Sequence, residues 1–428
     1  MRDDELQVLG KPHEQEKRDR WKIAIFVIAF LSITTVLGIN IYQVFFSPEP
    51  EIIDSGKKKG ESTIIPDLQT AVDSLLNAQM NVIGNCLQGQ VIVMDVQTGE
   101  ILAMVGLERK YDGTFQSCKN FAYQQELGSL MKTASLLTLF ERGIDSSYVV
   151  HTGMGVWPVE DGYEMKDHNW RRGGYGDVNL ARALEVSSNI GISVAVGNYY
   201  KGHESDFFDD LNKMSFGLPD HIEGIDGLKP TTYSSPKDKE WKNYDIWWSA
   251  IGYNRKIAPI QMLTFYNAIA NDGKMVKPTL KTGEIEIINP QIASKDNIKK
   301  MQVILNHVVS QGLGRKAGTP LVQVAGKQGT SQVGEYDFGE DNYVDEYQVA
   351  FCGYFPADMP MFSIIVSINK LGLPASGGGM AGTTCHYIIE WMLTHGMPPL
   401  IYVDDETNDT ICITEETLPS VIDSLFKK

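Results

Sequence analysis

One uncharged stretch near the N-terminus constrains this chain more than any other feature. Residues 23–46, IAIFVIAFLSITTVLGINIYQVFF, hold no charged side chain over 24 positions. A helix of that length can cross the hydrocarbon core of a bilayer. The segment before it is rich in basic side chains, namely Lys11, Lys17, Arg18, Arg20 and Lys22. This charge bias predicts a single-pass anchor, with a cytoplasmic tail of residues 1–22 and the rest of the chain outside the membrane.

Two other interpretations of residues 23–46 are a cleaved signal peptide and a buried globular helix. A signal peptide has a shorter apolar region followed by small residues at its cleavage site. This apolar run is longer and ends in QVFFSPEP. A buried helix of 24 residues without one charge is also unusual. Both considerations favour an uncleaved anchor.

Bulk composition excludes some functions and leaves others open. The 428 residues carry a net charge of −16, which argues against nucleic acid as a partner. Five scattered cysteines show no C-x-x-C spacing, so neither a zinc site nor a redox pair is indicated. In an exported domain they form one or two disulfides or serve as small buried hydrophobes, and the sequence leaves both open.

Hydrophobic spacing predicts a domain that begins after a short linker. Residues 47–65 are rich in Pro, Gly and charge and are interpreted as that linker. From Pro66 the apolar residues recur at helical spacing, and two apolar runs, 91–96 and 101–105, flank a turn-like QTGE. The latter pattern predicts a β-hairpin.

The rest of the pattern predicts an α+β domain with one antiparallel sheet flanked by helices. A helical middle includes a helix that begins at Pro259 and a second within residues 295–313. Turn-bounded, β-branched segments then predict three neighbouring strands, followed by a closing helix in CHYIIEWMLTHG. We expect this domain to span residues 66–398, with an acidic tail of 399–428 that holds a possible last short helix.

Ser129 and Lys132 lie three residues apart at the head of an apolar helical segment, GSLMKTASLLTLF. This spacing places both side chains on one helix face. Lysine can deprotonate a serine only if burial or nearby cations lower its pKa, and the apolar segment would supply burial. Taken alone, the pair is more often an N-cap serine beside a lysine that extends to solvent.

Two further short motifs carry polar groups suited to peptide chemistry. Ser187 and Asn189, in EVSSNIG, can converge on one point from a tight turn, although both residue types are also common in ordinary turns. Lys327, Gly329 and Thr330, in VAGKQGTSQ, fall on a predicted strand. A glycine inside a strand marks the close approach of another backbone, which suits a peptide laid along a sheet edge.

In order and context, these elements resemble the Ser-x-x-Lys, Ser-x-Asn and Lys-x-Gly motifs of penicillin-binding proteins and serine β-lactamases. Successive motifs are 58 and 140 residues apart. The sequence segments that flank the motifs, such as VIVMDVQTGEILAMVG and VAFCGYFPADMP, are similar to segments of the transpeptidase domain of class B, monofunctional penicillin-binding proteins. The resemblance covers about residues 66–398.

The resemblance implies a peptidoglycan D,D-transpeptidase on the outer side of a bacterial inner membrane. Ser129 matches the nucleophile, Lys132 its base, and Ser187 the proton relay to the leaving group. The resemblance also places Lys327 among the catalytic residues, as a strand lysine that holds the substrate carboxylate. It makes four further matches substrate-binding residues: Asn189, Gln328, Gly329 and Thr330. Thr330 would also supply an oxyanion N–H together with Ser129. The implied ligands are stem peptides and β-lactams, with cell-wall synthesis proteins as possible partners and no metal or cofactor.

The chain departs from the family pattern at three places. Gln328 stands where a hydroxyl residue usually follows the strand lysine, which predicts altered affinity for substrate and β-lactams. Leu127 stands where a proline commonly precedes the Gly-Ser pair. Only about twenty residues separate the anchor from the domain, where class B proteins usually carry a sizeable non-catalytic domain.

Three other functions use the same motifs. A membrane-tethered β-lactamase or D,D-carboxypeptidase would pass the acyl group to water. We find no deacylating glutamate of the class A type after the Ser-x-Asn turn. A sensor that binds cell-wall peptide or β-lactam without turnover is the non-enzymatic alternative, since fold does not fix function.

Overall fold

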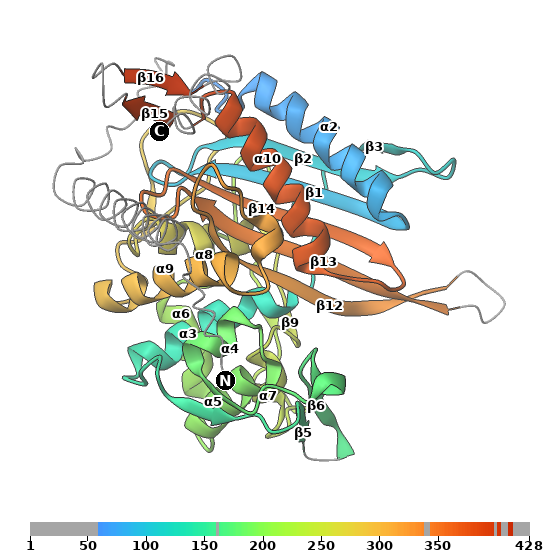
Figure 1. The fold of residues 1–428 in the computed structure, drawn as a ribbon, viewed down its shortest axis with the longest axis vertical. Coiled ribbons are helices and arrows are strands. Elements are labelled where there is room, and N and C mark those ends of the chain that lie inside the picture. The colour runs from blue at the N-terminus through green and yellow to red at the C-terminus, as the bar shows by residue number, and fades with distance from the viewer. Residues whose placement is uncertain (1–58, 160–161, 338–342, 398–399, 404–409, 414–428) are drawn as a thin grey trace, which may run out of the picture. The chain divides into compact units, whose positions relative to one another are not determined.

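The computed structural model describes residues 59–159, 162–337, 343–397, 400–403 and 410–413 (Figure 1). The predicted cytoplasmic tail and anchor lie outside these residues. Within the described ranges, no helix is both long and apolar enough to cross a bilayer.

A six-stranded antiparallel sheet, in the order β12-β13-β14-β1-β2-β3, forms the centre of the fold (Figure 1). Its strands are β1 (Cys86–Asp95), β2 (Ile101–Arg109), β3 (Phe115–Ser117), β12 (Ala325–Asp337), β13 (Tyr343–Phe355) and β14 (Phe362–Leu371). The predicted hairpin is confirmed, because β1 and β2 pair with Val91 opposite Val105. The three predicted neighbouring strands are β12, β13 and β14, and β14 also pairs with β1.

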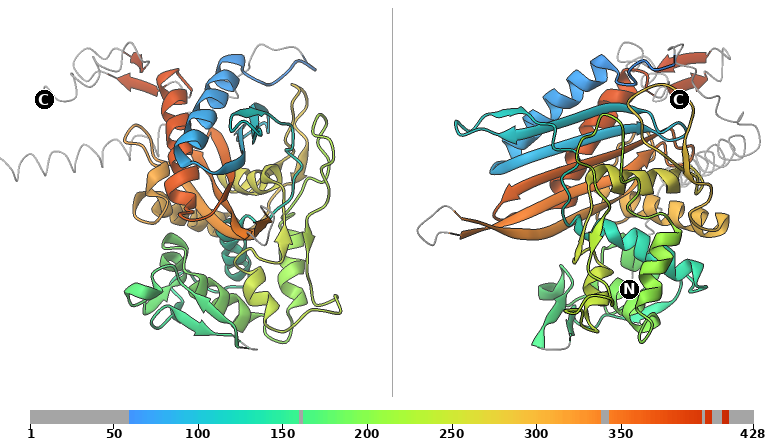
Figure 2. Two further views of the ribbon diagram at one scale, coloured as in Figure 1. Left: turned by 90° about the vertical axis from the view of Figure 1, so that its right-hand side faces the viewer. Right: turned by 180° about the vertical axis from the view of Figure 1, so that it is seen from behind.

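Two helices, α2 (Pro66–Ile83) and α10 (Thr383–Thr394), pack side by side on one face of the sheet (Figures 1 and 2). Pro66 begins α2 because its missing N–H is one that a first helical turn leaves unpaired anyway. Its buried residues recur every four positions: Leu68, Val72, Leu76 and Met80. They join one hydrophobic core with alternate residues of the sheet.

The opposite face of the sheet is covered by α8 (Pro259–Ala270), every residue of which is buried. Helix α8 begins at Pro259, as predicted. Since helices cover both faces, all ten residues of β14 are buried. A second hydrophobic core lies on this side and continues into the helical middle of the chain.

The helical middle contains the remaining helices together with short strands. The helices are α3 (Met131–Glu141), α4 (Leu180–Glu185), α5 (Asn189–Tyr199), α6 (Ser205–Lys213), α7 (Asp245–Ser249) and α9 (Lys295–Ser310). The short strands are β4 (Val149–His151), β5 (Val156–Pro158), β6 (Glu164–Lys166), β7 (Asp177–Asn179), β8 (Thr232–Tyr233), β9 (Arg255–Lys256), β10 (Met275–Val276) and β11 (Ile287–Asn289). They form two-stranded sheets that no sequence pattern indicates, because two or three residues show no measurable periodicity.

The described part of the predicted acidic tail forms an antiparallel pair of strands, β15 (Leu400–Val403) and β16 (Thr410–Ile413). The possible short helix therefore finds no support within the described tail residues, and residues 414–428 lie outside them.

The cysteines whose side chains are described form no disulfide. Cys86, Cys352 and Cys385 are buried, and Cys118 is partly exposed. Three of these four thiols therefore serve as small hydrophobes in the two cores.

Candidate active site

The predicted nucleophile and base lie at the start of α3. Ser129 sits in a 3₁₀ turn, Gly128–Leu130, that leads directly into the helix. Lys132 is in the first turn of α3 and is completely buried, as the apolar sequence after it predicts. All ten residues from Met131 to Phe140 are buried, so this helix cannot serve as a solvated surface helix.

Two glycines let the Ser129 turn pack directly against β12. Gly128 has φ +53°, and a Cβ there would lie 2.8 Å from the carbonyl oxygen of Thr330. A Cβ at Gly329 would lie 2.4 Å from the carbonyl oxygen of Leu127. The close backbone approach predicted at Gly329 is therefore present, and the approaching backbone is the chain's own turn.

Hydrogen bonds from β12 and from α8 fix the turn that carries Ser129. The Ser331 hydroxyl on β12 donates to the carbonyl oxygen of Glu126 at 2.5 Å. The Tyr266 hydroxyl on α8 donates to the carbonyl oxygen of Leu130 at 2.9 Å. Ser129 is thus held between the sheet and the helix beneath it, as a nucleophile that must keep one position requires.

Three of the predicted residues meet at one hydroxyl group. The Ser187 Oγ atom lies 2.9 Å from the Nζ of Lys327 and 3.3 Å from the Nζ of Lys132. Ser187 follows α4 and has φ +54°, a left-handed conformation that is uncommon for serine. Such strain is found at functional sites because the surrounding structure must hold it in place.

Lys132 has two further partners on the Ser-x-Asn turn. Its Nζ donates to the carbonyl oxygen of Ser187 and to Oδ1 of Asn189, each at 2.7 Å. The Asn189 Nδ2 donates to the carbonyl oxygen of Lys166 at 2.7 Å, which assigns the orientation of the amide. A neutral amine has two N–H bonds and one lone pair. If these two acceptors take both hydrogens, the lone pair remains free to accept a proton.

Burial shifts the titration of both lysines. Desolvation lowers the pKa of Lys132 to about 7, and the charge of Asp167 opposes this only in part. Burial also lowers the pKa of Lys327 well below its ordinary value, and the charge of Lys132 lowers it further. A substantial fraction of Lys132 is therefore neutral near pH 7, as a general base requires.

Asp167, which no sequence motif indicates, organises the Ser-x-Asn turn. Its fully buried carboxylate accepts hydrogen bonds from the Ser188 hydroxyl at 2.8 Å and from the backbone N–H groups of Asn189 at 2.6 Å and Ile190 at 3.1 Å. These groups begin α5, so the carboxylate caps that helix from outside its sequence. A single aspartate in a polar loop gives no sequence signal for this function.

Gln328 and Thr330 lie on the opposite side of β12 from Lys327. The Thr330 hydroxyl accepts a hydrogen bond from the backbone N–H of Gly377 at 2.9 Å. The Gln328 side chain is buried next to Gly378, and its Oε1 has no hydrogen-bond partner among the described residues. The predicted alternation is present, while substrate binding by these two residues stays a prediction.

No group of three or more His, Cys, Asp or Glu side chains that could hold a metal ion occurs within the described ranges. The predicted independence from cofactors stays a prediction.

Comparison with known proteins identifies the family. A family model described as "Penicillin binding protein transpeptidase domain" matches residues 89–390. The chain is 26% identical over 379 residues to penicillin-binding protein PbpB of Mycobacterium tuberculosis, covering 79% of this chain and 52% of that protein. It is 23% identical over 291 residues to peptidoglycan D,D-transpeptidase FtsI of Escherichia coli, covering 66% and 47%. It thus spans about half the length of these relatives.

Solved structures share the fold. The transpeptidase domain of Burkholderia pseudomallei penicillin-binding protein 3 superposes with a TM-score of 0.65 at 23% identity, covering 79% of this chain and 97% of that one.

Proposed function

The chain belongs to the penicillin-binding protein transpeptidase family, and from that premise we propose that it is a peptidoglycan D,D-transpeptidase that works through a Ser129 acyl-enzyme. The observation that carries this proposal is the buried Lys132, whose hydrogen bonds orient its amine and whose pKa is lowered to about 7. A lysine in that state is a base for the serine one helical turn before it.

Acylation follows from these contacts. Lys132 takes the proton of Ser129 as Oγ attacks the carbonyl between the two D-alanines of a stem peptide. The N–H groups of Ser129 and Thr330 stabilise the oxyanion. Once Lys132 has taken the Ser129 proton, it carries three N–H bonds and can donate to Ser187 Oγ, as Lys327 does, so the Ser187 hydrogen is available to the leaving amine. The amine then departs as free D-alanine.

Substrate binding uses the residues around this centre. Lys327, Gln328, Gly329 and Thr330 are the proposed subsite for the terminal carboxylate, and Asn189 binds the peptide amide. A bound carboxylate would raise the pKa of Lys327 by its opposite charge. Substrate therefore favours the charged form of a lysine whose pKa is lowered by burial and by the charge of Lys132.

The location of the chain and its ligands can also be proposed. We propose a cytoplasmic tail (1–22), an inner-membrane helix (23–46), a linker (47–65), a transpeptidase domain (66–398) outside the membrane, and a tail (399–428). The uncharged run and its basic flank support the anchor. We also propose covalent binding of β-lactams at Ser129 and contacts with cell-wall synthesis proteins.

A peptide assay tests the proposed activity. The full chain is incubated with a donor peptide ending in D-alanyl-D-alanine and an amine acceptor, and free D-alanine, amide product and hydrolysed peptide are quantified. We expect D-alanine release coupled to amide product, abolished in Ser129→Ala and unchanged in Ser147→Ala, an exposed serine after the same helix. Hydrolysed peptide as the sole product would instead assign a carboxypeptidase, and release by Ser129→Ala would refute the acyl-enzyme.

A further inference from the structure

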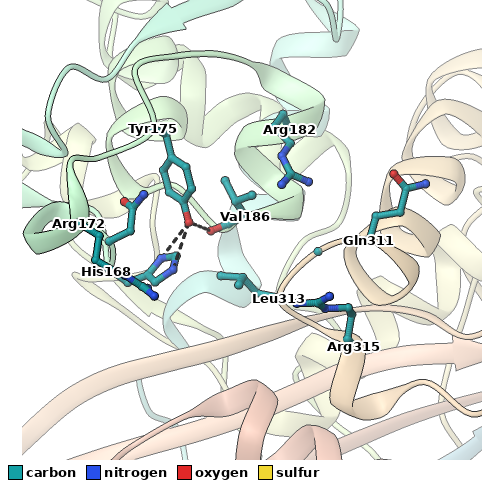
Figure 3. Close-up of a pocket in the computed structure, with 10 residues that line it drawn as sticks. His168, Arg172, Tyr175, Arg182, Val186, Gln311, Leu313 and Arg315 are labelled. Atoms are coloured by element: carbon teal, nitrogen blue, oxygen red, sulfur yellow. Dashed lines mark hydrogen bonds between the residues drawn. The ribbon is translucent and has the colours of Figure 1, made fainter.

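Each half of the catalytic centre depends on side chains that lie outside its own motif. On the half that carries Ser187, the Tyr175 hydroxyl donates to the carbonyl oxygen of Val186 at 3.3 Å, beside a cavity of about 300 Å³ (Figure 3). Asp167 caps the helix that follows this turn. The half that carries Ser129 requires a comparable support, because displacement of a nucleophile by about 1 Å can slow a reaction a hundredfold.

The loop between α7 and β9, residues 250–254, packs directly against the turn that carries Ser129. Gly252 in this loop has φ +99°, and a Cβ there would lie 2.1 Å from the carbonyl oxygen of Gly128. Gly128 also packs against the backbone of Thr330 on β12. The backbone of the turn therefore contacts the backbones of two elements, the loop and β12, with no side chain between them.

Hydrogen bonds attach the loop to the chain at both of its ends. At the start of the loop, the Ser135 hydroxyl of α3 donates to the carbonyl oxygen of Ala250 at 2.8 Å. Beyond its end, Ile257 exchanges two backbone hydrogen bonds with Gln125, at 3.1 and 3.2 Å. These contacts fix the ends of the loop, and the middle of the loop lies against the turn.

Glu126 joins the middle of the loop to the turn. The backbone N–H of Asn254 donates to Oε1 of Glu126 at 2.9 Å. Asn254 has φ +60°, a left-handed conformation that needs support from its surroundings. The carbonyl oxygen of Glu126 accepts the hydrogen bond from Ser331 on β12. One residue, two positions before Gly128, therefore connects the turn to the loop through its side chain and to β12 through its backbone.

We propose that Glu126 is a positioning residue for the acylation of Ser129 and that it acts through its hydrogen bond to the loop. The inference rests on the proposed acyl-enzyme and does not require Glu126 to touch the substrate. Without this hydrogen bond, the loop can move away from Gly128, and the Ser129 hydroxyl loses its fixed position. The chemical step should therefore become slower, while the noncovalent binding that precedes it, which uses other residues, should not change.

The length of the Glu126 side chain should be more important than its charge. Burial raises the pKa of Glu126, and the hydrogen bond from Asn254 and the charge of Lys256 oppose this only in part. The surroundings therefore do not favour the charged carboxylate. A neutral amide of the same length can accept the same hydrogen bond, whereas a shorter carboxylate cannot reach Asn254 unless the loop moves.

Stopped-flow acylation of the full chain by a chromogenic penicillin tests this assignment. Measurement over a range of penicillin concentrations separates the acylation rate constant from the dissociation constant of the noncovalent complex. We expect Glu126→Ala and Glu126→Asp to lower the rate constant about tenfold, the effect of one hydrogen bond to a charged group, with the dissociation constant unchanged. Glu126→Gln should remain within about twofold of the unmodified chain. Glu126→Asp keeps the test decisive if Glu126→Ala does not fold.

Glu141→Ala is the matched control. The Glu141 carboxylate also accepts a backbone hydrogen bond, from the N–H of Ser294 at 3.0 Å, and it lies at the opposite end of α3 from Ser129. Its loss should lower the free energy of unfolding and leave the acylation rate constant unchanged. Circular dichroism shows whether each variant is folded at the temperature of the rate measurement.

An unchanged rate constant in the folded Glu126→Asp variant would overturn the proposal. A rate constant for Glu126→Gln as low as that for Glu126→Asp would show that length alone does not restore acylation, and it would overturn the proposal too. If the unmodified chain formed no acyl adduct, the Ser129 acyl-enzyme itself would be refuted, a result distinct from both.

Discussion

Lys132 and Lys327 come from segments almost 200 residues apart, yet both place their Nζ atoms within hydrogen-bond distance of the Ser187 hydroxyl. Lys132 belongs to α3 and Lys327 to β12, and both side chains are completely buried. Two ammonium groups around one hydroxyl disfavour double protonation. The closeness of the two Nζ atoms therefore favours states of the site in which at most one of the two lysines is protonated.

The lowered pKa of Lys132 predicts a pH profile. Because the neutral amine is the base, acylation should rise as pH increases through the pKa of about 7 and level off above it. The neutral fraction for such a pKa grows roughly tenfold between pH 6 and pH 8. Stopped-flow acylation by a chromogenic penicillin measures this rate. A flat profile across that interval, or an inflection near the ordinary pKa of lysine, would contradict the proposed base.

Substitution of Gly329 should damage the site through packing. A Cβ there would meet the carbonyl oxygen of Leu127 at 2.4 Å, so Gly329→Ala must displace the turn that carries Ser129. We expect acylation to slow at least a hundredfold, since small displacements of a nucleophile carry such costs. Gly334→Ala, on the same strand, is the control because its Cβ would meet nothing within 4 Å. Similar rates for the two variants would show that the close contact is not needed.

Asp167 should act as a positioning residue. Asp167→Asn removes the buried charge and replaces one acceptor oxygen by an NH₂ group. If the remaining oxygen stays on the N–H groups of Asn189 and Ile190, this NH₂ faces the Ser188 hydroxyl, which donates to the carboxylate in the unmodified chain. The expected loss in the free energy of unfolding is about 3 kcal/mol, the cost of a buried charged hydrogen-bond network. Asp177→Asn should cost little, because Asp177 is an exposed strand residue. Urea unfolding followed by circular dichroism compares the two, and equal midpoints would refute the capping function.

The rate of acylation by the same chromogenic penicillin distinguishes a positioning residue from one that contributes to stability alone. Substitution of a residue that only stabilises the fold would leave this rate unchanged in the folded protein. Asp167→Asn should slow acylation even under conditions where it is fully folded, because the turn that carries Ser187 is held by the hydrogen bonds of Ser188 and Asn189 to this carboxylate. An unchanged acylation rate in the folded variant would show that Asp167 contributes to stability and does not position the catalytic residues.

Gln328 is the departure from the family pattern with the clearest consequence. Gln328→Thr restores a hydroxyl and removes a buried Oε1 that has no partner among the described residues. We expect penicillin acylation to be about tenfold faster, the effect of one added hydrogen bond to a carboxylate. Gln332→Thr, farther along the same strand and exposed, should leave the rate unchanged. A slower Gln328→Thr variant would show that the amide contributes to binding.

Local sequence patterns predicted much of the fold. Pro66 and Pro259 each mark the first residue of a helix, and the apolar runs beside QTGE form β1 and β2. These features depend on short-range periodicity and capping, which a sequence displays directly. The pairing of β14 with β1 depends on contacts between residues far apart in the chain, so no local pattern indicates it.

In the candidate site, too, contacts between residues far apart in the chain leave no local sequence pattern. The order of their motifs indicates Ser129, Lys132 and Lys327, and the structure adds hydrogen bonds that join the two lysines to Ser187. Asp167 has no motif, since its importance arises only when its loop folds against the start of α5.

Covalent labelling tests the central claim most directly. The full chain is incubated with a fluorescent penicillin, digested, and the labelled peptide is located by mass spectrometry, with loss of label followed over time. We predict one long-lived adduct on the peptide that contains Ser129, absent in Ser129→Ala. An adduct on another residue, or label retained by Ser129→Ala, would contradict the Ser129 acyl-enzyme. Label lost within seconds would contradict the transpeptidase and favour a β-lactamase.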